Sequence, residues 1–310
     1  MEINRVAIIG LGALGMLFGQ RMVERTPPGT LTVLADAERV KRYERDGVYV
    51  NGERCHFQYS TPEGLVEPAD LLIFAVKFGD LEAAVKAVKP CVGPDTIILS
   101  LLNGISSEGI IGRALGHEKV LPAVAQGMDA VKVGNRMTYA NMGIIAFGDR
   151  PGGGGGDRVE AVRRFFTRAD VPHQVDEDMQ RRMWGKFMLN VGVNQAVAVF
   201  ECDYGGVQRS GEARDAMIQA MREALTLARA EGIPLTEDDL SYWLNVLSTL
   251  NPSGKPSMRQ DLEAGRESEV GLFAGTVLEL GEKHGIDCPV NRMLFDRIQA
   301  IERGFSRRNG

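Results

Sequence analysis

The 310-residue sequence has few cysteines and histidines, and neither type is grouped. The cysteines are Cys55, Cys91, Cys202 and Cys288, and the histidines are His56, His117, His173 and His284. A disulfide framework or a structural zinc site needs closely spaced cysteines, and no C-x-x-C pair is present. The sequence therefore predicts no bound metal and no disulfides, and it fits a reducing cytoplasm.

The sequence also lacks a basic excess and a long apolar run. Its 36 basic and 41 acidic residues give a formal net charge of -5, which argues against a nucleic-acid partner. No stretch is long enough to cross a bilayer without a polar interruption. The apolar run near the N-terminus contains four glycines and leads into QRMVER, so a folded element explains it better than a signal peptide does. We expect a cytoplasmic, globular protein.

The chain begins with a strand, turn and helix pattern that is typical of dinucleotide binding. The apolar run Val6–Ile9 predicts a buried parallel strand. Glycines then follow in the spacing G-x-G-x-x-G, which allows a tight turn, approach of the backbone to a pyrophosphate and close packing of the helix. The predicted cofactor-binding residues are Gly10, Gly12, Ala13, Leu14 and Gly15. A packing turn in another kind of α/β protein is the alternative.

The second predicted strand, LTVLAD, ends at Asp36. An acidic residue about twenty positions beyond the glycines usually accepts from the ribose 2′-hydroxyl of NAD(H), whereas a nearby arginine suits the 2′-phosphate of NADP(H). Asp36 is followed by Glu38, Arg39, Lys41 and Arg42. Position favours Asp36 and NAD(H), the basic cluster favours NADP(H), and all these charges also fit the solvated start of a helix.

Two further apolar strands end in polar residues. ADLLIFAV predicts a strand that ends at Lys77, and TIILSLLNG predicts one that ends at Asn103 and Gly104. Ligands of open α/β sheets bind beyond the carboxyl ends of the strands, so we predict that Lys77 and Asn103 lie near the cofactor. A surface lysine and an Asn-Gly turn are the structural alternatives. The later spacer PGGGGGD predicts a surface loop between a strand and a helix.

From about Asp178 the pattern changes to long helices without intervening strands. One helix ends with Gly232 in a C-cap position, and the next begins with Thr236 as its N-cap. We predict an α/β domain over residues 1–177 and an all-helical domain over residues 178–310, with a small-molecule site in a cleft between them. The helices fit packing within a monomer or across a homodimer, and no heptad run decides between these.

The first of these helices carries a polar stripe on an apolar stretch. Steps of four residues, at about 100° per residue, bring Lys186, Asn190 and Asn194 onto one side. Burying such groups is costly unless they are paired. The stripe therefore predicts either a polar contact with the neighbouring domain or a catalytic surface that faces a ligand.

The segment SMRQDLEAGRESE contains two more candidates. Ser257 and Gln260 fit a capping box with Ser257 as the N-cap, a position from which serine can also contact a carboxylate. Glu269 is expected three turns along the same helical segment, either at the site or paired with Arg266. A straight helix would separate Ser257 from Glu269 by about 18 Å, so both contact one small ligand only if the segment bends or the helix begins later.

Together these motifs resemble the ketopantoate reductase (2-dehydropantoate 2-reductase) family over nearly the whole chain. The resemblance rests on GLGALG, on Asn103-Gly104, on KFMLNVGVN from Lys186 to Asn194, and on SMRQDLEAGRESE from Ser257 to Glu269. It implies a Rossmann-type domain followed by a helical domain like the C-terminal domain of 6-phosphogluconate dehydrogenase. It also implies reduction of the 2-keto group of ketopantoate with NADPH, towards pantothenate and coenzyme A.

The resemblance implies a role for each candidate. Lys186 is similar to the family's catalytic lysine and Glu269 to its essential glutamate. The counterparts of its substrate-contacting residues are Asn103, Asn190, Asn194 and Ser257, of which Asn103 also touches the cofactor. The chemistry agrees, because hydride arriving at a ketone leaves negative charge on oxygen, which an ammonium can stabilise and protonate. A carboxylate beside that ammonium keeps it cationic.

Three positions depart from the family's pattern. Asp36 stands where an arginine is common, and Gly271 stands where an aspartate often follows the glutamate. An asparagine commonly precedes the family's serine, and the nearest here, Asn251, is not assigned that role. Two alternatives to ketopantoate reduction therefore stay open: reduction of another branched 2-keto acid, and a dinucleotide-binding sensor without turnover.

Overall fold

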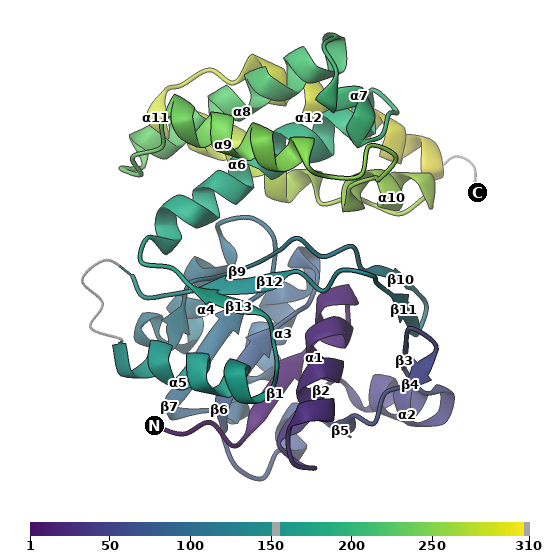
Figure 1. Ribbon diagram of the computed structural model, residues 1–310, viewed down its shortest axis with the longest axis vertical. Coiled ribbons are helices and arrows are strands. Elements are labelled where there is room, and N and C mark those ends of the chain that lie inside the picture. The colour runs from purple at the N-terminus through teal and green to yellow at the C-terminus, as the bar shows by residue number, and fades with distance from the viewer. Residues whose placement is uncertain (151–155, 307–310) are drawn as a thin grey trace. The chain divides into compact units, whose positions relative to one another are not determined.

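The chain divides into two compact units in the computed structural model, which describes residues 1–150 and 156–306. The first unit comprises Met1–Met179 and the second Gln180–Gly310. The first has a parallel α/β fold, and the described part of the second contains helices only (Figure 1). No helix among the described residues is long and apolar enough to cross a membrane. Of the predicted spacer PGGGGGD, residues 151–155 lie outside the described residues, and Gly156 and Asp157 begin a helix.

Six parallel strands form the central sheet of the first unit, in the order β5-β2-β1-β6-β7-β8 (Figure 1). They are β1 (Val6–Ile9), β2 (Leu31–Leu34), β5 (Gln58–Ser60), β6 (Ala69–Phe74), β7 (Val92–Ser100) and β8 (Val120–Leu121). This is the doubly wound order, in which the first strand lies centrally and the chain turns back beside it. The predicted strands are confirmed, although β6 and β7 end three residues before Lys77 and Asn103.

Helices cover both faces of this sheet. Val6 and Ile8 of β1 pack in one core with α1 (Ala13–Arg25) and α5 (Gly156–Arg168). Ala7 and Ile9 face the other core, with α3 (Leu81–Ala87) and α4 (Ser107–Leu115). Successive side chains of a strand point to opposite faces, so a sheet covered on both sides needs strands that are apolar throughout.

Two smaller sheets complete the unit. One has the order β10-β11-β3-β4, and the other β13-β12-β9. Their strands are β3 (Tyr49–Val50), β4 (Glu53–Arg54), β9 (Ala123–Gln126), β10 (Val131–Val133), β11 (Arg136–Thr138), β12 (Ile144–Phe147) and β13 (His173–Val175). The strand predicted before the glycine-rich spacer is β12, whereas β3, β4, β10, β11 and β13 have two or three residues each, too few for an alternating pattern to be recognised.

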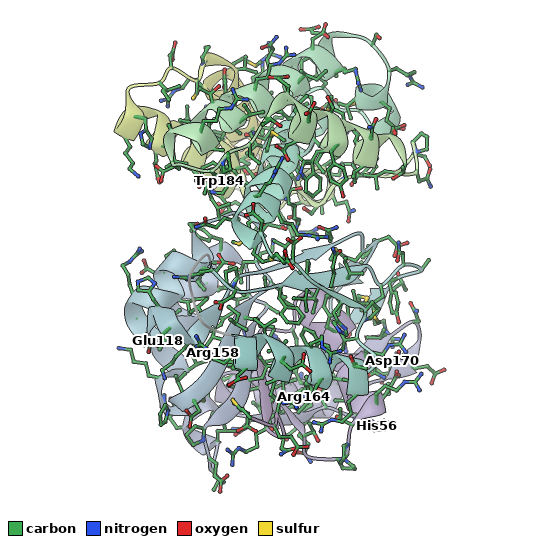
Figure 2. The ribbon with its side chains drawn as sticks, turned by 60° about the vertical axis from the view of Figure 1, so that its left-hand side comes forward. His56, Glu118, Arg158, Arg164, Asp170 and Trp184 are labelled. Carbon is green, nitrogen blue, oxygen red and sulfur yellow. The ribbon has the colours of Figure 1, made fainter. Side chains whose placement is uncertain are left out.

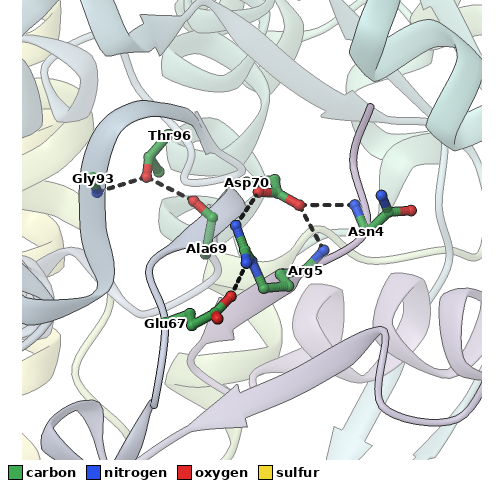
Figure 3. A network of polar contacts seen from close by, with 7 residues as sticks. All are labelled: Asn4, Arg5, Glu67, Ala69, Asp70, Gly93 and Thr96. Atoms are coloured by element: carbon green, nitrogen blue, oxygen red, sulfur yellow. Dashed lines mark hydrogen bonds and ion pairs between the residues drawn. The ribbon is translucent and has the colours of Figure 1, made fainter. Parts of the chain in front are cut away.

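A polar network ties together the amino ends of the central strands (Figure 3). Asp70 Oδ2 accepts from the backbone N–H groups of Asn4 and Arg5, both at 2.9 Å, and Asp70 Oδ1 accepts from the Arg5 guanidinium at 2.9 Å. Thr96 Oγ1 donates to the carbonyl of Ala69 at 2.6 Å and joins β7 to β6. These bonds fix the sheet at the edge opposite the carboxyl ends of its strands.

Eight helical segments make up the described part of the second unit. They are α6 (Met179–Val199), α7 (Tyr204–Gln208), α8 (Glu212–Ala230), α9 (Glu237–Ser248), α10 (Ser257–Glu263), the π-helical turn η5 (Gly271–Gly275), α11 (Thr276–His284) and α12 (Pro289–Ser306). Thr236 is the N-cap of α9, and Asp239 Oδ2 accepts from its backbone N–H at 2.7 Å. The predicted start of α9 is confirmed. The C-cap of α8 is Glu231, and Gly232, with φ +80°, comes one residue later, so the predicted C-cap is displaced by one position.

Helix α6 packs through a seam of glycines. A Cβ on Gly185 would overlap the indole nitrogen of Trp243 in α9, and one on Gly192 would lie 2.8 Å from the carbonyl of Met217 in α8. Trp184, which Figure 2 labels, lies on the same helix and packs edge-on against Phe187 with 5.8 Å between ring centroids. The glycines therefore bring α8 and α9 close to one side of α6 and leave its other side for polar residues.

Candidate active site

The glycine loop between β1 and α1 has a shape that lets the protein backbone approach the phosphate groups of a ligand. Gly10 has φ +98°, and a Cβ there would lie 2.7 Å from the carbonyl oxygen of Ala75. A Cβ on Gly15 would overlap the carbonyl of Gly10. Gly12 is the N-cap of α1, so the N–H groups of Ala13 and Leu14 begin the helix at this loop. Because only glycine fits this cradle, the residues present fit a dinucleotide's pyrophosphate.

Asp36 lies beside this loop, at the carboxyl end of β2. The register pairs Ile9 with Leu34, so Asp36 follows β2 just as Leu11 and Gly12 follow β1. Its side chain is 58% exposed and caps α2 (Ala37–Asp46), since Oδ1 accepts from the backbone N–H of Arg39 at 2.7 Å. The Arg39 Nε lies 3.4 Å from Asp36 Oδ2. Both readings of Asp36, as a helix start and as a neighbour of the cofactor loop, agree with this placement.

Lys77 and Asn103 lie beyond the carboxyl ends of adjacent strands. Ile9 pairs with Phe74, and Phe74 pairs with Ser100, so β1, β6 and β7 end side by side. Lys77 is exposed and Asn103 is half-buried. The central sheet thus brings both residues to the same edge as the glycine loop, where open α/β sheets bind their ligands.

A buried polar chain behind Asn103 has no counterpart in the sequence-based predictions. The Ser100 and Ser107 hydroxyl oxygens are 2.8 Å apart, and Ser107 Oγ donates to Glu108 Oε2 at 2.9 Å. All three side chains are buried, Glu108 at 6% exposure. The chain links the end of β7 to the first turn of α4 and so holds the loop that carries Asn103. The only signal in the sequence is an acidic residue five positions after that asparagine, which single-sequence reasoning cannot tell from an exposed helix charge.

The structure brings the three residues of the polar stripe together on α6. The three residues Lys186, Asn190 and Asn194 lie about 100° to 180° around the helix from Gly185, so they face away from the glycine seam. Lys186 and Asn190 are half-buried, whereas Asn194 is 6% exposed. The side-chain oxygen of Asn194 is buried and has no hydrogen-bond partner. Since buried polar groups are almost always satisfied, this amide oxygen can accept a hydrogen bond from a ligand or a water molecule.

Ser257 is not the N-cap that the capping box predicts. Pro256 is the N-cap of α10, with Ser257 as its first helical residue, and Gln260 Nε2 donates to the carbonyl of Lys255 at 2.8 Å instead of reaching back to Ser257. Proline fixes its own φ near the extended value that an N-cap adopts, which moves the helix start by one residue. Ser257 is exposed.

Glu269 does not lie on the same helix as Ser257, so that prediction is also wrong. Helix α10 ends at Glu263, and Gly265 with φ +66° turns the chain. Arg266 pairs with Asp261, not with Glu269, with Nη2 2.8 Å from Oδ1. The bend removes the straight-helix separation of about 18 Å between Ser257 and Glu269.

Glu269 lies two residues before the π-helical turn that leads into α11. Its carbonyl accepts from Leu272 N at 2.9 Å, and its side chain is half-buried. The preceding residue is anchored, because Glu302 Oε1 of α12 accepts from the Ser268 N–H at 2.7 Å. A carboxylate is favourable at a helix N-terminus, and π-helical turns occur frequently at functional sites.

Thiol and metal chemistry find no support in the described residues. Burial raises the pKa of Cys55 to about 12 and that of Cys91 and Cys288 to about 11. Such thiols stay protonated at neutral pH and are poor nucleophiles. No group of three potential metal-ligating side chains occurs among residues 1–150 and 156–306, and His56 is exposed in the first unit (Figure 2).

The doubly wound sheet, its glycine loop and the helical second unit define a dinucleotide-dependent oxidoreductase. The chain belongs to the ketopantoate reductase family: the family model "Ketopantoate reductase PanE/ApbA" matches residues 6–152, and "Ketopantoate reductase PanE/ApbA C terminal" matches residues 178–302. It is therefore an NAD(P)-dependent oxidoreductase. The predicted family and fold class are confirmed.

Similar proteins span the whole chain. The 2-dehydropantoate 2-reductases of Halobacterium salinarum and Archaeoglobus fulgidus are 28% and 27% identical, over 96% and 98% of this chain and 99% and 100% of theirs. A PanE/ApbA family ketopantoate reductase from Ralstonia eutropha is 26% identical and superposes with a TM-score of 0.82, over 97% of this chain and 99% of that one. D-mandelate dehydrogenase with NADH shares the fold at 20% identity, with a TM-score of 0.86 and the same coverage.

Proposed function

We propose that the protein reduces 2-dehydropantoate to pantoate with a reduced nicotinamide dinucleotide, a step towards pantothenate and coenzyme A. Residues 1–177 hold the dinucleotide and residues 178–310 supply the catalytic groups. The observation that carries the proposal is the stripe of Lys186, Asn190 and Asn194, with its buried and unpartnered amide oxygen, in a chain of this family.

The cofactor is held by the first unit. The N–H groups of the loop from Gly10 to Gly15 bind the pyrophosphate, and Lys77 and Asn103 line the same edge of the sheet. Bound there, the reduced nicotinamide supplies a hydride to the keto carbon of the substrate. The chain's own residues bind, orient and protonate that substrate.

Lys186 is the general acid. Its ammonium stabilises the negative charge that develops on the keto oxygen and donates the proton that completes the alcohol. Glu269 accepts from a substrate hydroxyl and holds Lys186 cationic, because a nearby carboxylate favours the charged form of an ammonium. Asn190, Asn194 and Ser257 bind the hydroxyl and carboxylate oxygens, since amides and hydroxyls can donate without changing charge.

The function is tested by following dinucleotide absorbance with 2-dehydropantoate as the substrate. We expect steady turnover by the wild type and a loss of about 100-fold to 10,000-fold in kcat for Lys186→Ala, the usual contribution of a general acid. Lys283→Ala removes a lysine of α11 whose side chain is 59% exposed, and it should leave kcat unchanged. Dinucleotide binding by Lys186→Ala should equal that of the wild type. If Lys186→Ala turns over as fast as the wild type, Lys186 is not the general acid.

A second candidate is a reductase of a bulkier 2-keto acid. Gly271 stands where the family usually has an aspartate, and a Cβ there would meet no atom within 4 Å. The glycine therefore leaves open space two residues after Glu269. A panel that includes 2-dehydropantoate, aliphatic 2-keto acids and phenylglyoxylate separates the two candidates by kcat/KM. Higher kcat/KM for another acid would reject 2-dehydropantoate as the substrate. Tight dinucleotide binding without turnover of any acid is the result that a sensor would give.

A further inference from the structure

The exposed carboxylate at the end of β2 sets the charge of the cofactor site. We propose that Asp36 makes this site select NADH over NADPH, contrary to the NADPH preference that the family resemblance implies. The inference rests on the proposed function only in taking the loop from Gly10 to Gly15 as the dinucleotide site. It makes Asp36 a residue that determines specificity for one of two cofactors.

The position of Asp36 follows from the register of the sheet. β1 and β2 are adjacent and parallel, and Ile9 pairs with Leu34. The backbone stays in register beyond β2, since Ala35 N donates to Ser60 O of β5 at 3.1 Å. A dinucleotide whose pyrophosphate lies at the start of α1 places its adenosine ribose over the end of β2. Asp36 is the first charged residue that this ribose meets.

The Asp36 carboxylate discriminates by charge and by hydrogen bonding. An ionised carboxylate only accepts hydrogen bonds, so it can receive both ribose hydroxyls of NADH. A 2′-phosphate carries about -1.5 to -2 charges at pH 7 and has acceptor oxygens, so it would face a like charge without a donor. Capping holds the carboxylate in place, because Oδ1 accepts from the Arg39 N–H at 2.7 Å.

The basic residues that follow do not reverse this charge. The nearest, Arg39, has its Nε 3.4 Å from Asp36 Oδ2, so the carboxylate already engages it. Arg42 lies over the ring of Tyr43 at 5.5 Å, and Arg45 pairs with Asp46 at 2.6 Å. Lys41 is five residues into α2, about 7.5 Å further along its axis than the cap. A phosphate at the end of β2 would therefore meet Asp36 before any of these cations.

The experiment measures the dissociation constants of NADH and NADPH for the purified, substrate-free protein by fluorescence titration at one ionic strength. We expect NADPH to bind at least about 100-fold more weakly, equivalent to about 2.7 kcal/mol at 1.36 kcal/mol per tenfold. Asp36→Ser keeps a capping hydroxyl and removes the charge, so the ratio should fall below about 10. In Asp36→Ser, Arg39 no longer pairs with a carboxylate and can face the 2′-phosphate. The double variant Asp36→Ser/Arg39→Gln should therefore bind NADPH more weakly than Asp36→Ser does.

Asp46→Asn is the matched control, because it removes one carboxylate from the other end of α2 and should leave both constants unchanged. Equal or tighter binding of NADPH by the wild type, an unchanged ratio in Asp36→Ser, or binding of neither dinucleotide would overturn the proposal. Turnover is a separate readout. Selective binding of NADH without reduction of 2-dehydropantoate would reject the proposed function and leave the selectivity of Asp36 standing.

Discussion

Gly15 is the residue at which the glycine loop between β1 and α1 tolerates least change. A Cβ there would overlap the carbonyl oxygen of Gly10, which is backbone and cannot rotate away as a side chain would. We therefore expect Gly15→Ala to displace the loop, weaken dinucleotide binding by more than tenfold and cost about 1–3 kcal/mol of stability through overpacking. Titration with NADH and chemical denaturation measure the two effects.

Gly304→Ala is the control for this replacement. Gly304 lies in α12, and a Cβ there would meet no atom within 4 Å. Alanine is the better helix former, so this variant should be neutral or slightly stabilised. Dinucleotide binding that is unchanged in Gly15→Ala would show that the loop does not hold the pyrophosphate.

At the scale of elements, Glu231 joins the ends of two helices of the second unit. It follows α8, and it binds Lys283 at 2.5 Å and also His284, both in the last turn of α11. Hydrogen bonds from His284 and Lys283 hold the pKa of Glu231 below its ordinary value. A lowered carboxyl pKa stabilises the fold above the ordinary pKa, and this contribution disappears as the pH falls through the lowered value.

Glu231→Gln should therefore lower the Tm by about 2–4 °C at pH 7, as expected for a partly exposed ion pair. The difference from the wild type should shrink as the pH falls below about 4. Thermal unfolding followed by circular dichroism between pH 3 and pH 8 measures both. Glu279→Gln replaces an exposed glutamate of α11 and should show no such pH dependence. A difference that grew on acidification would contradict this account of the linkage.

The elements differ in how far the sequence predicts them. Strands β1, β2 and β6 and the second half of β7 are largely buried, so their apolar runs are unambiguous. The break between α10 and η5 is not readable in the same way, because Gly265 inside a helical pattern is as compatible with a continuous helix as with a turn. The start of α10 depends on whether Pro256 or Ser257 is the N-cap, and both residue types suit a helix start.

The residues of the candidate site also differ in how far the sequence predicts them. The glycines and the α6 stripe depend on local spacing, so the sequence predicts which residues share a side. The orphaned oxygen of Asn194 and the buried chain from Ser100 to Glu108 depend on how the side chains pack, which residue spacing does not report. Family resemblance, not periodicity, singles out Glu269, because nothing local distinguishes it from Glu267.

At the scale of the whole molecule, the residues proposed to hold the cofactor and those proposed for catalysis belong to different units, and helix α6 starts at the boundary between the units. Helix α6 begins at Met179, the last residue of the first unit, and continues without a break into the second. Both tryptophans, Trp184 and Trp243, lie in the second unit. Tryptophan fluorescence therefore follows the second unit, whereas circular dichroism follows both.

NADH at about 100 times its dissociation constant should stabilise the protein by about 2.7 kcal/mol. Because α6 is continuous across the two units, we expect the fluorescence and circular dichroism transitions to shift together to higher temperature. Thermal scans with and without NADH make the comparison, with AMP as a control ligand that lacks the nicotinamide half. A shift in circular dichroism without a shift in fluorescence would show that the units unfold independently.

Asp36 both caps α2 and, as we propose, selects the cofactor, so few substitutions at this position can change the cofactor preference without loss of the cap. Arginine is not among the residues that cap helices well, so a direct exchange of Asp36 for a phosphate-binding arginine would uncap α2 at a cost of about 1 kcal/mol. Serine or asparagine removes the charge and keeps the cap. Sequences with serine or asparagine at this position are therefore the stable intermediates between an NADH-using and an NADPH-using enzyme. Engineering of NADPH use into this protein should follow the same order of substitutions.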